Sequence, residues 1–126
     1  MGGRAVIVAG FGFRSAATQA SLASALARAG GVRPDWVATV ADKAGAAVFR
    51  AFAAGLGCPA VGVDAARLAE QVTLTHSAAS LAARGTGSVA EAAALSAAGQ
   101  GARLIGPRVV SDDGCATCAL AQGEGP

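Results

Sequence analysis

The chain has 126 residues, of which 53% are apolar and 14% are charged, and its formal net charge is +2. This composition excludes a disordered chain. The small charge, without any Lys/Arg run and with five scattered aromatic residues, argues against nucleic-acid binding. No apolar stretch has the length of a transmembrane helix, so we expect a cytoplasmic protein that makes no membrane contact.

Five short, mostly apolar runs predict β-strands, because each has the length of a buried strand. In chain order they are Ala5–Ala9, Trp36–Val40, Pro59–Val63, Arg103–Ile105 and Cys115–Ala121. N-cap residues and glycines between these runs predict helices. The helices begin at Ser15, Asp42, Asp64 and Ser88 and end near Ala29, Gly55, Gln71 and Ala98. Residues 72–84 are expected to form a loop with one or two helical turns.

Strands that alternate with helices predict a three-layer α/β/α fold with a mainly parallel, mixed sheet of about five strands. We expect one domain over residues 1–121, followed by a mobile tail over residues 122–126. In such sheets, ligands bind beyond the carboxyl ends of the strands. The first strand is followed by Gly10-Phe11-Gly12-Phe13-Arg14, which is expected to form a turn at this edge.

A second glycine turn, Gly85-Thr86-Gly87-Ser88, leads directly into a helix. Ser88 is a natural N-cap, and Glu91 three residues later completes the pattern of a capping box. The two glycines free the backbone to expose its N–H groups, and a helix N-terminus of this kind attracts anions.

Arg14, Lys43 and Arg84 place positive charge near these turns. They predict a cationic rim that suits a ligand with several carboxylates or phosphates. The candidate ligand-binding residues are Gly10, Gly12, Arg14, Ser15, Lys43, Gly85, Thr86, Gly87 and Ser88.

Few side chains of the chain suit acid–base catalysis. His76 is the only histidine and the only side chain whose unperturbed pKa lies near neutrality. It and Glu91 are the candidate catalytic residues, although a surface histidine and a capping-box glutamate are the simpler interpretations. Cys115 and Cys118 form a C-x-x-C pair without a second pair or a nearby histidine, so we expect plain strand residues and no metal site.

A nucleotide-binding module is a weaker alternative function. Gly10-Phe11-Gly12 begins a G-x-G-x-x-G pattern, but Ser15 stands at its third small position. The second strand also ends without the acidic residue that would hold a ribose.

Six segments match the sequence pattern of one known family in order. They are Gly10–Ala17, Thr39–Lys43, Leu56–Pro59, Gly85–Leu95, Ala97–Arg108 and Thr117–Ala121, and the run G-T-G-S-V-A-E-A-A-A-L of Gly85–Leu95 is the most specific. In these segments the chain resembles the cobalamin-biosynthesis family that comprises CobE and the C-terminal domain of CbiG. Phe13 stands where the family pattern has a cysteine.

The resemblance implies a role in building the corrin ring, in a free-standing, CobE-like form. The implied partners are a tetrapyrrole or corrin intermediate and other cobalamin-pathway enzymes, and no cofactor is expected. CbiG-type proteins open a ring lactone of a cobalt-precorrin and release acetaldehyde, so an enzyme of this family would be a precorrin lactone hydrolase or act in a related step. The alternative is a non-catalytic corrinoid carrier or accessory protein. Corrin intermediates carry many acetate and propionate side chains, which agrees with a cationic rim.

Overall fold

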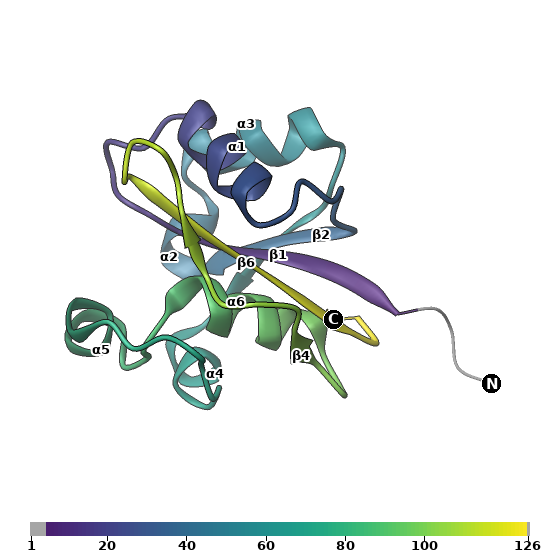
Figure 1. Cartoon of the computed structure of the whole chain (residues 1–126), viewed down its shortest axis with the longest axis vertical. Coiled ribbons are helices and arrows are strands. Elements are labelled where there is room, and N and C mark those ends of the chain that lie inside the picture. Colours follow the sequence, from purple (N-terminus) through teal and green to yellow (C-terminus); the bar gives the residue numbers. More distant parts are fainter. Residues whose placement is uncertain (1–4, 126) are drawn as a thin grey trace.

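The computed structural model describes residues 5–125 and shows a mixed sheet of six strands with helices on both faces (Figure 1). The strands are β1 (Val6–Phe13), β2 (Trp36–Val40), β3 (Ala60–Val63), β4 (Arg103–Leu104), β5 (Val109–Val110) and β6 (Ala116–Gly123). The helices are α1 (Gln19–Arg28), α2 (Ala41–Ala44), α3 (Ala47–Leu56), α4 (Ala65–Ala69), α5 (Ala78–Arg84) and α6 (Val89–Ala98). The expected three-layer α/β/α architecture is confirmed.

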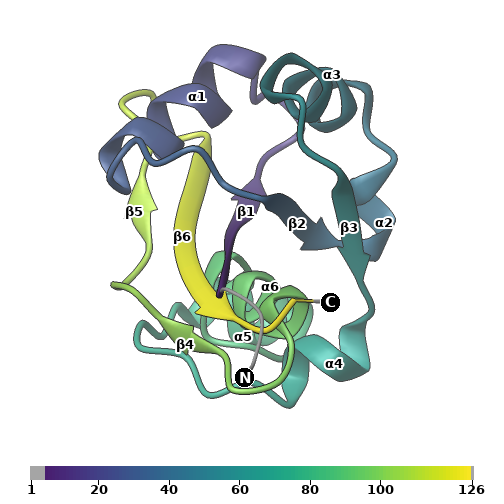
Figure 2. The ribbon, with the colours of Figure 1, turned by 90° about the vertical axis from the view of Figure 1, so that its right-hand side faces the viewer.

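The strand order is β3-β2-β1-β6-β4, and β5 also pairs with β6. β1, β2 and β3 are parallel, as expected for strands joined by helices. β6 runs antiparallel to β1 and pairs with it along its whole length, from Val6 opposite Gly123 to Phe13 opposite Ala116. The carboxyl end of β1 therefore lies beside the start of β6 (Figure 2).

Each face of the sheet has its own core. On the face covered by α1 and α3, the ring of Phe11 meets Phe49 and Phe52 edge to face, with centroids 6.1 and 5.3 Å apart. On the other face, α6 lies directly against the sheet, and every residue from Ala90 to Ala98 is buried. Alanines dominate this helix, and their small side chains allow its backbone to approach the strands closely.

Two strands extend well beyond the ends that the sequence predicts. β1 does not end at Ala9 but continues through Gly10 and Gly12 to Phe13. β6 does not end at Ala121 but continues to Gly123, because these residues pair with β1 and β4, and Gly125 forms a bridge with Gly99. Residues 122–125 are thus paired with their neighbours rather than forming a free tail; Pro126 lies outside the described residues.

Two helices also begin elsewhere than expected. α1 begins after Thr18 and not at Ser15, because the hydroxyls of Thr18 and Ser21 each accept a hydrogen bond from the other residue's backbone N–H. The expected helix from Asp42 is interrupted at Gly45 and forms α2 and α3. α4, α5 and α6 agree with the sequence, and their N-caps are Asp64, Ser77 and Ser88. No helix within residues 5–125 is long and apolar enough to cross a bilayer.

Candidate functional site

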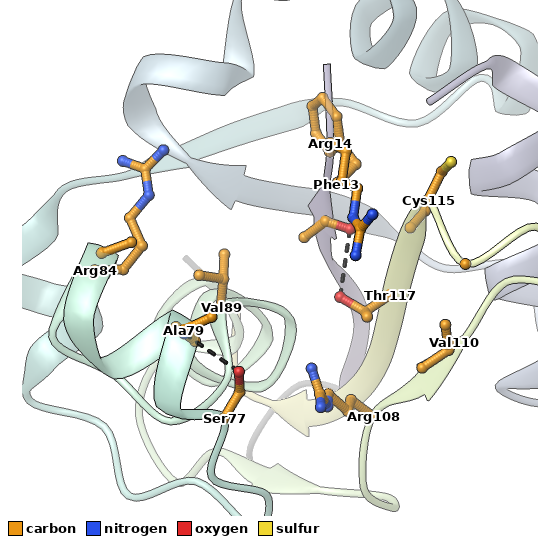
Figure 3. Close-up of a pocket in the computed structure, with 15 residues that line it drawn as sticks. Phe13, Arg14, Ser77, Ala79, Arg84, Val89, Arg108, Val110, Cys115 and Thr117 are labelled. Atoms are coloured by element: carbon orange, nitrogen blue, oxygen red, sulfur yellow. Dashed lines mark hydrogen bonds between the residues drawn. The ribbon is translucent and has the colours of Figure 1, made fainter. Parts of the chain in front are cut away.

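A pocket of about 530 Å³ lies at the carboxyl end of β1, between α5 and the sheet (Figure 3). The end of β1 and the turn after it, α5, the first residue of α6, and the segment from Arg108 to Thr117 all contribute to its walls. Residues more than 100 positions apart, such as Gly12 and Thr117, therefore meet here, because β6 returns antiparallel beside β1. The sequence predicts a ligand site at this same edge of the sheet.

Three arginines line this pocket, and none of the described residues that line it is acidic. Arg14 follows β1, Arg84 ends α5, and Arg108 precedes β5 (Figure 3). Arg84 donates to both carboxylate oxygens of Asp42, at 3.0 and 3.1 Å. Arg14 and Arg108 have no ion-pair partner among residues 5–125. Two guanidinium groups are therefore available for an anionic ligand.

Apolar and hydroxyl groups complete the lining. Val89 and Val110 contribute apolar surface, and Thr117 lies between the strand ends with its hydroxyl donating to the carbonyl of Gly12 at 3.3 Å. Ser77 caps α5 by accepting from the N–H of Ser80 at 3.2 Å. This combination of apolar surface and a few charged groups is typical of small-molecule sites.

The structure brings only part of the predicted ligand-binding set to this pocket. Gly12 and Arg14 line it. Gly10 does not, because it lies buried in the middle of β1 beneath α6, where a side chain would collide with the helix backbone. Ser15 lies in the exposed turn after β1, is not among the residues that line the pocket, and does not cap α1.

Lys43 lies beside the pocket in an adjoining recess of about 70 Å³, which it shares with Gly12 and Arg84. Its ammonium group donates to the carbonyl of Phe13 and lies 4.9 Å from the centroid of that ring. Burial, together with the charge of Arg84, lowers the pKa of Lys43, and Asp42 opposes this shift. The lysine thus holds the end of β1 in place at the border of the site.

The glycine turn before α6 is not part of the pocket lining. Gly85 ends α5 in the left-handed conformation, with φ of 71°. Thr86, Gly87 and Ser88 are buried, and a Cβ atom on Gly87 would stand 2.6 Å from the carbonyl oxygen of Thr75. Ser88 caps the helix that follows this turn, as the sequence predicts. The turn, however, packs against residues 73–76 and does not open onto the pocket.

Glu91 makes different contacts from those of a capping box. Ser88 caps α6 by accepting from the N–H of Glu91 at 3.2 Å, but the carboxylate does not return a bond to Ser88. It accepts instead from the backbone of Leu74, Thr75 and Arg108, and it is fully buried. As a candidate catalytic residue, it therefore lies outside the pocket lining.

His76, the other candidate catalytic residue, is exposed and directly precedes Ser77 of the pocket wall, without lining the pocket itself.

Cys115 is half-buried and lines the pocket, whereas Cys118 lies in the core, where burial raises the pKa of its thiol. Within residues 5–125 no group of three His, Cys, Asp or Glu side chains is placed to hold a metal ion.

Arg108 is the charged residue of the pocket that the sequence interpretation missed. It follows Gly106-Pro107, a dipeptide that indicates only the end of a strand. Its location in the pocket depends on the pairing of β5 with β6 and on its backbone bond to Glu91. The sequence signal that could have identified it is its position directly before the paired strands β5 and β6.

Comparison with known proteins agrees with this architecture. A family model described as "Cobalamin synthesis G C-terminus" matches residues 7–121. The crystal structure of CobE, described as a protein from the cobalamin (vitamin B12) biosynthetic pathway, is similar with a TM-score of 0.80 and 30% identity, over 97% of this chain and 93% of that one. The cobalamin biosynthesis protein ChiG from Agrobacterium tumefaciens is similar with a TM-score of 0.70 and 36% identity, over 94% and 98% of the two chains. No curated protein matches the sequence.

Proposed function

The chain belongs to the cobalamin synthesis G C-terminus family, and from this premise we propose that it binds a polycarboxylate precorrin or corrin intermediate in the pocket between α5 and the sheet. One observation carries the proposal. Arginines from three separate elements, Arg14, Arg84 and Arg108, line a single pocket in which none of the described lining residues is acidic.

The chemistry of the arginines fits the side chains of such a ligand. A guanidinium group binds a carboxylate through two parallel hydrogen bonds, and these charge-assisted bonds are stronger than neutral ones. Arg14 and Arg108 have no protein carboxylate partner among the described residues, so an acetate or propionate arm can take that place. Val89 and Val110 provide apolar surface for the carbon framework beside these arms.

The size of the pocket supports binding through one edge of the macrocycle. Its volume of about 530 Å³ lies within the range of small-molecule sites, roughly 300–1,000 Å³. Its rim includes the exposed residues Arg14 and Gly114, so the pocket opens to solvent on this side. A ligand with carboxylates all around its ring can therefore direct two of them to Arg14 and Arg108 while the rest remain solvated.

An absorbance titration tests this proposal. Hydrogenobyrinic acid is the probe, and a corrinoid in which the same side chains are amides is the matched control for charge. We expect saturable binding of the acid, weaker binding of the amide, and a loss of affinity as salt concentration rises. ATP and NAD serve as nucleotide controls. Tight binding of a nucleotide, without retention of the corrin, would overturn the proposal in favour of a nucleotide-binding module.

The composition of the lining favours a binding role without turnover. The described residues that line the pocket include no carboxylate or imidazole, the side chains that most often perform general acid–base chemistry. A carrier of this kind would receive the intermediate from one pathway enzyme and deliver it to another.

Catalysis is the second candidate, because the exposed His76 adjoins Ser77 of the wall. Release of acetaldehyde from a cobalt-precorrin lactone by the pure protein, abolished by His76→Gln, would establish the enzyme.

A further inference from the structure

A single buried carboxylate joins two segments on either side of the pocket. Glu91 is 0% exposed and lies in the first turn of α6. Its Oε1 accepts from the N–H groups of Leu74 and Thr75, at 2.6 and 3.0 Å. Its Oε2 accepts from the Thr75 hydroxyl at 3.0 Å and from the N–H of Arg108 at 2.8 Å. No cation pairs with it in the described part of the chain.

The two segments held by this carboxylate carry opposite walls of the pocket. Leu74 and Thr75 lead directly to Ser77, at which α5 begins, and α5 carries Arg84. Arg108 provides its own guanidinium group to the pocket. Figure 3 shows Ser77 and Arg108 facing the pocket from these different elements.

The α5 wall has little other support, whereas the segment after Arg108 also pairs with β6 and bonds to α1 through Asp112 and Asp113. α5 is a seven-residue helix without a buried residue, and its contacts include the bond from Ser77 N–H to the carbonyl of Gly87 and the exposed ion pair of Arg84 with Asp42. β5, which follows Arg108, has two residues. Four hydrogen bonds hold this buried carboxylate in one orientation, because each bond requires its own donor geometry. Glu91 therefore bonds to both walls and links the position of one to that of the other.

We propose that Glu91 is a positioning residue that holds Arg108 and the start of α5 at the separation required for ligand binding. This inference rests on the proposed function, because it takes the pocket to be the ligand site. Glu91 acts through the backbone of Arg108 and does not itself touch the ligand. The chain uses the carboxylate as a clamp between two loops rather than as an acid catalyst.

The substitution Glu91→Gln tests the bond to Arg108 separately from the bonds to Leu74 and Thr75. The glutamine oxygen can still accept from Leu74 and Thr75, and its amino group can donate to the Thr75 hydroxyl. The same amino group faces the N–H of Arg108, however, and two donors cannot bond to each other. Glu91→Gln should therefore release Arg108 and leave the other segment attached.

Affinities for hydrogenobyrinic acid in two mutant cycles test this coupling. We expect Glu91→Gln to weaken binding at least fivefold in the parent protein and by a similar factor in an Arg14→Ala background. In an Arg108→Ala background the substitution should change the affinity less than twofold, because the residue that it positions is absent. An equal loss in all three backgrounds would indicate general destabilisation and would overturn the proposal.

Hydrogen exchange of the ligand-free protein provides a second test that does not depend on any ligand. In the parent protein, the amides of Leu74, Thr75 and Arg108 should be protected from exchange to a similar degree, because all three donate to the same carboxylate. In Glu91→Gln, exchange at Arg108 should accelerate at least tenfold while the β1–β2 amides are unchanged. Fast exchange at Arg108 already in the parent protein would refute the clamp, even if the variant fails to fold. Failure of the parent to bind the corrin, with these exchange results intact, would refute the proposed function and leave the clamp standing.

Discussion

Gly10 lies so close beneath α6 that a Cβ atom built on it would stand 2.1 Å from the carbonyl oxygen of Ala90. The same atom would stand 2.5 Å from the backbone nitrogen of Ala94. Both neighbours are helix backbone, so neither can rotate away as a side chain would. This glycine therefore sets the distance between the sheet and its central helix.

Replacement of Gly10 by alanine should destabilise the protein by about 3 kcal/mol or more, because overpacking a core against rigid backbone exceeds the usual cost of an added methyl group. Urea unfolding measures the change. Gly55→Ala is the matched control, since nothing lies within 4 Å of its Cβ position in α3. That substitution should stabilise the protein by about 0.5–1 kcal/mol through helix propensity. Equal stabilities of the two variants would contradict the close approach of α6.

The β5–β6 turn should make stability sensitive to acid. Hydrogen bonds from the hydroxyls of Ser111 and Ser21 and from the N–H of Cys115 lower the pKa of Asp113 from 3.8 to about 2. Because the folded state favours the charged carboxylate, its contribution to stability is complete above pH 3.8 and is lost as pH falls through about 2.

Thermal unfolding between pH 5 and pH 2 measures this dependence. Asp113→Asn should lower the melting temperature at pH 5 and flatten its decline toward pH 2, since the titrating group is gone. Asp112→Asn is the control, because its exposed carboxylate bonds to Arg28 across the surface. An Asp113→Asn curve parallel to that of the parent would show that these bonds do not depend on the charge.

The three cysteines should differ in reactivity. Cys115 is half-buried at the pocket, whereas Cys58 and Cys118 are buried, and burial raises the pKa of the Cys118 thiol. A maleimide reagent should therefore label the native protein once, at Cys115, as measured by mass spectrometry. Cys115→Ser should remove this label and retain corrin binding within about twofold, while the bulky label itself should block binding. Rapid labelling of Cys118 in the folded protein would contradict its place in the core.

The local patterns of the sequence were sufficient for many elements of the fold. The apolar run Trp36–Val40 is β2 without change, and Ser88 and Gly99 bound α6 as their capping preferences predict. The end of β1 was not predictable, because glycines usually indicate a turn. Gly10 and Gly12 lie within the strand because they pair with Ala119 and Thr117 of β6, which come from a distant part of the chain.

The site depends even more on distant contacts. Arg14 was predictable, since it follows the first strand at the edge where ligands bind. Arg108 was not, because its place is set by Glu91 and by the pairing of β5 with β6. Glu91 itself has the spacing of a capping box, yet donors of Thr75 and Arg108, 16 and 17 residues away, hold its carboxylate instead. Local spacing identified the residue but could not specify which donors would hold it.

The central claim is that Arg14 and Arg108 bind carboxylates of a corrin intermediate, and calorimetric titration of Arg14→Ala/Arg108→Ala with hydrogenobyrinic acid tests it most directly. Loss of two charge-assisted hydrogen-bonding contacts, at about 1.5 kcal/mol each, should weaken binding about 100-fold. Arg50→Ala removes an exposed arginine of α3 that does not line the pocket, and its affinity should equal that of the parent. If the folded double variant binds hydrogenobyrinic acid as tightly as Arg50→Ala does, the pocket between α5 and the sheet is not the ligand site.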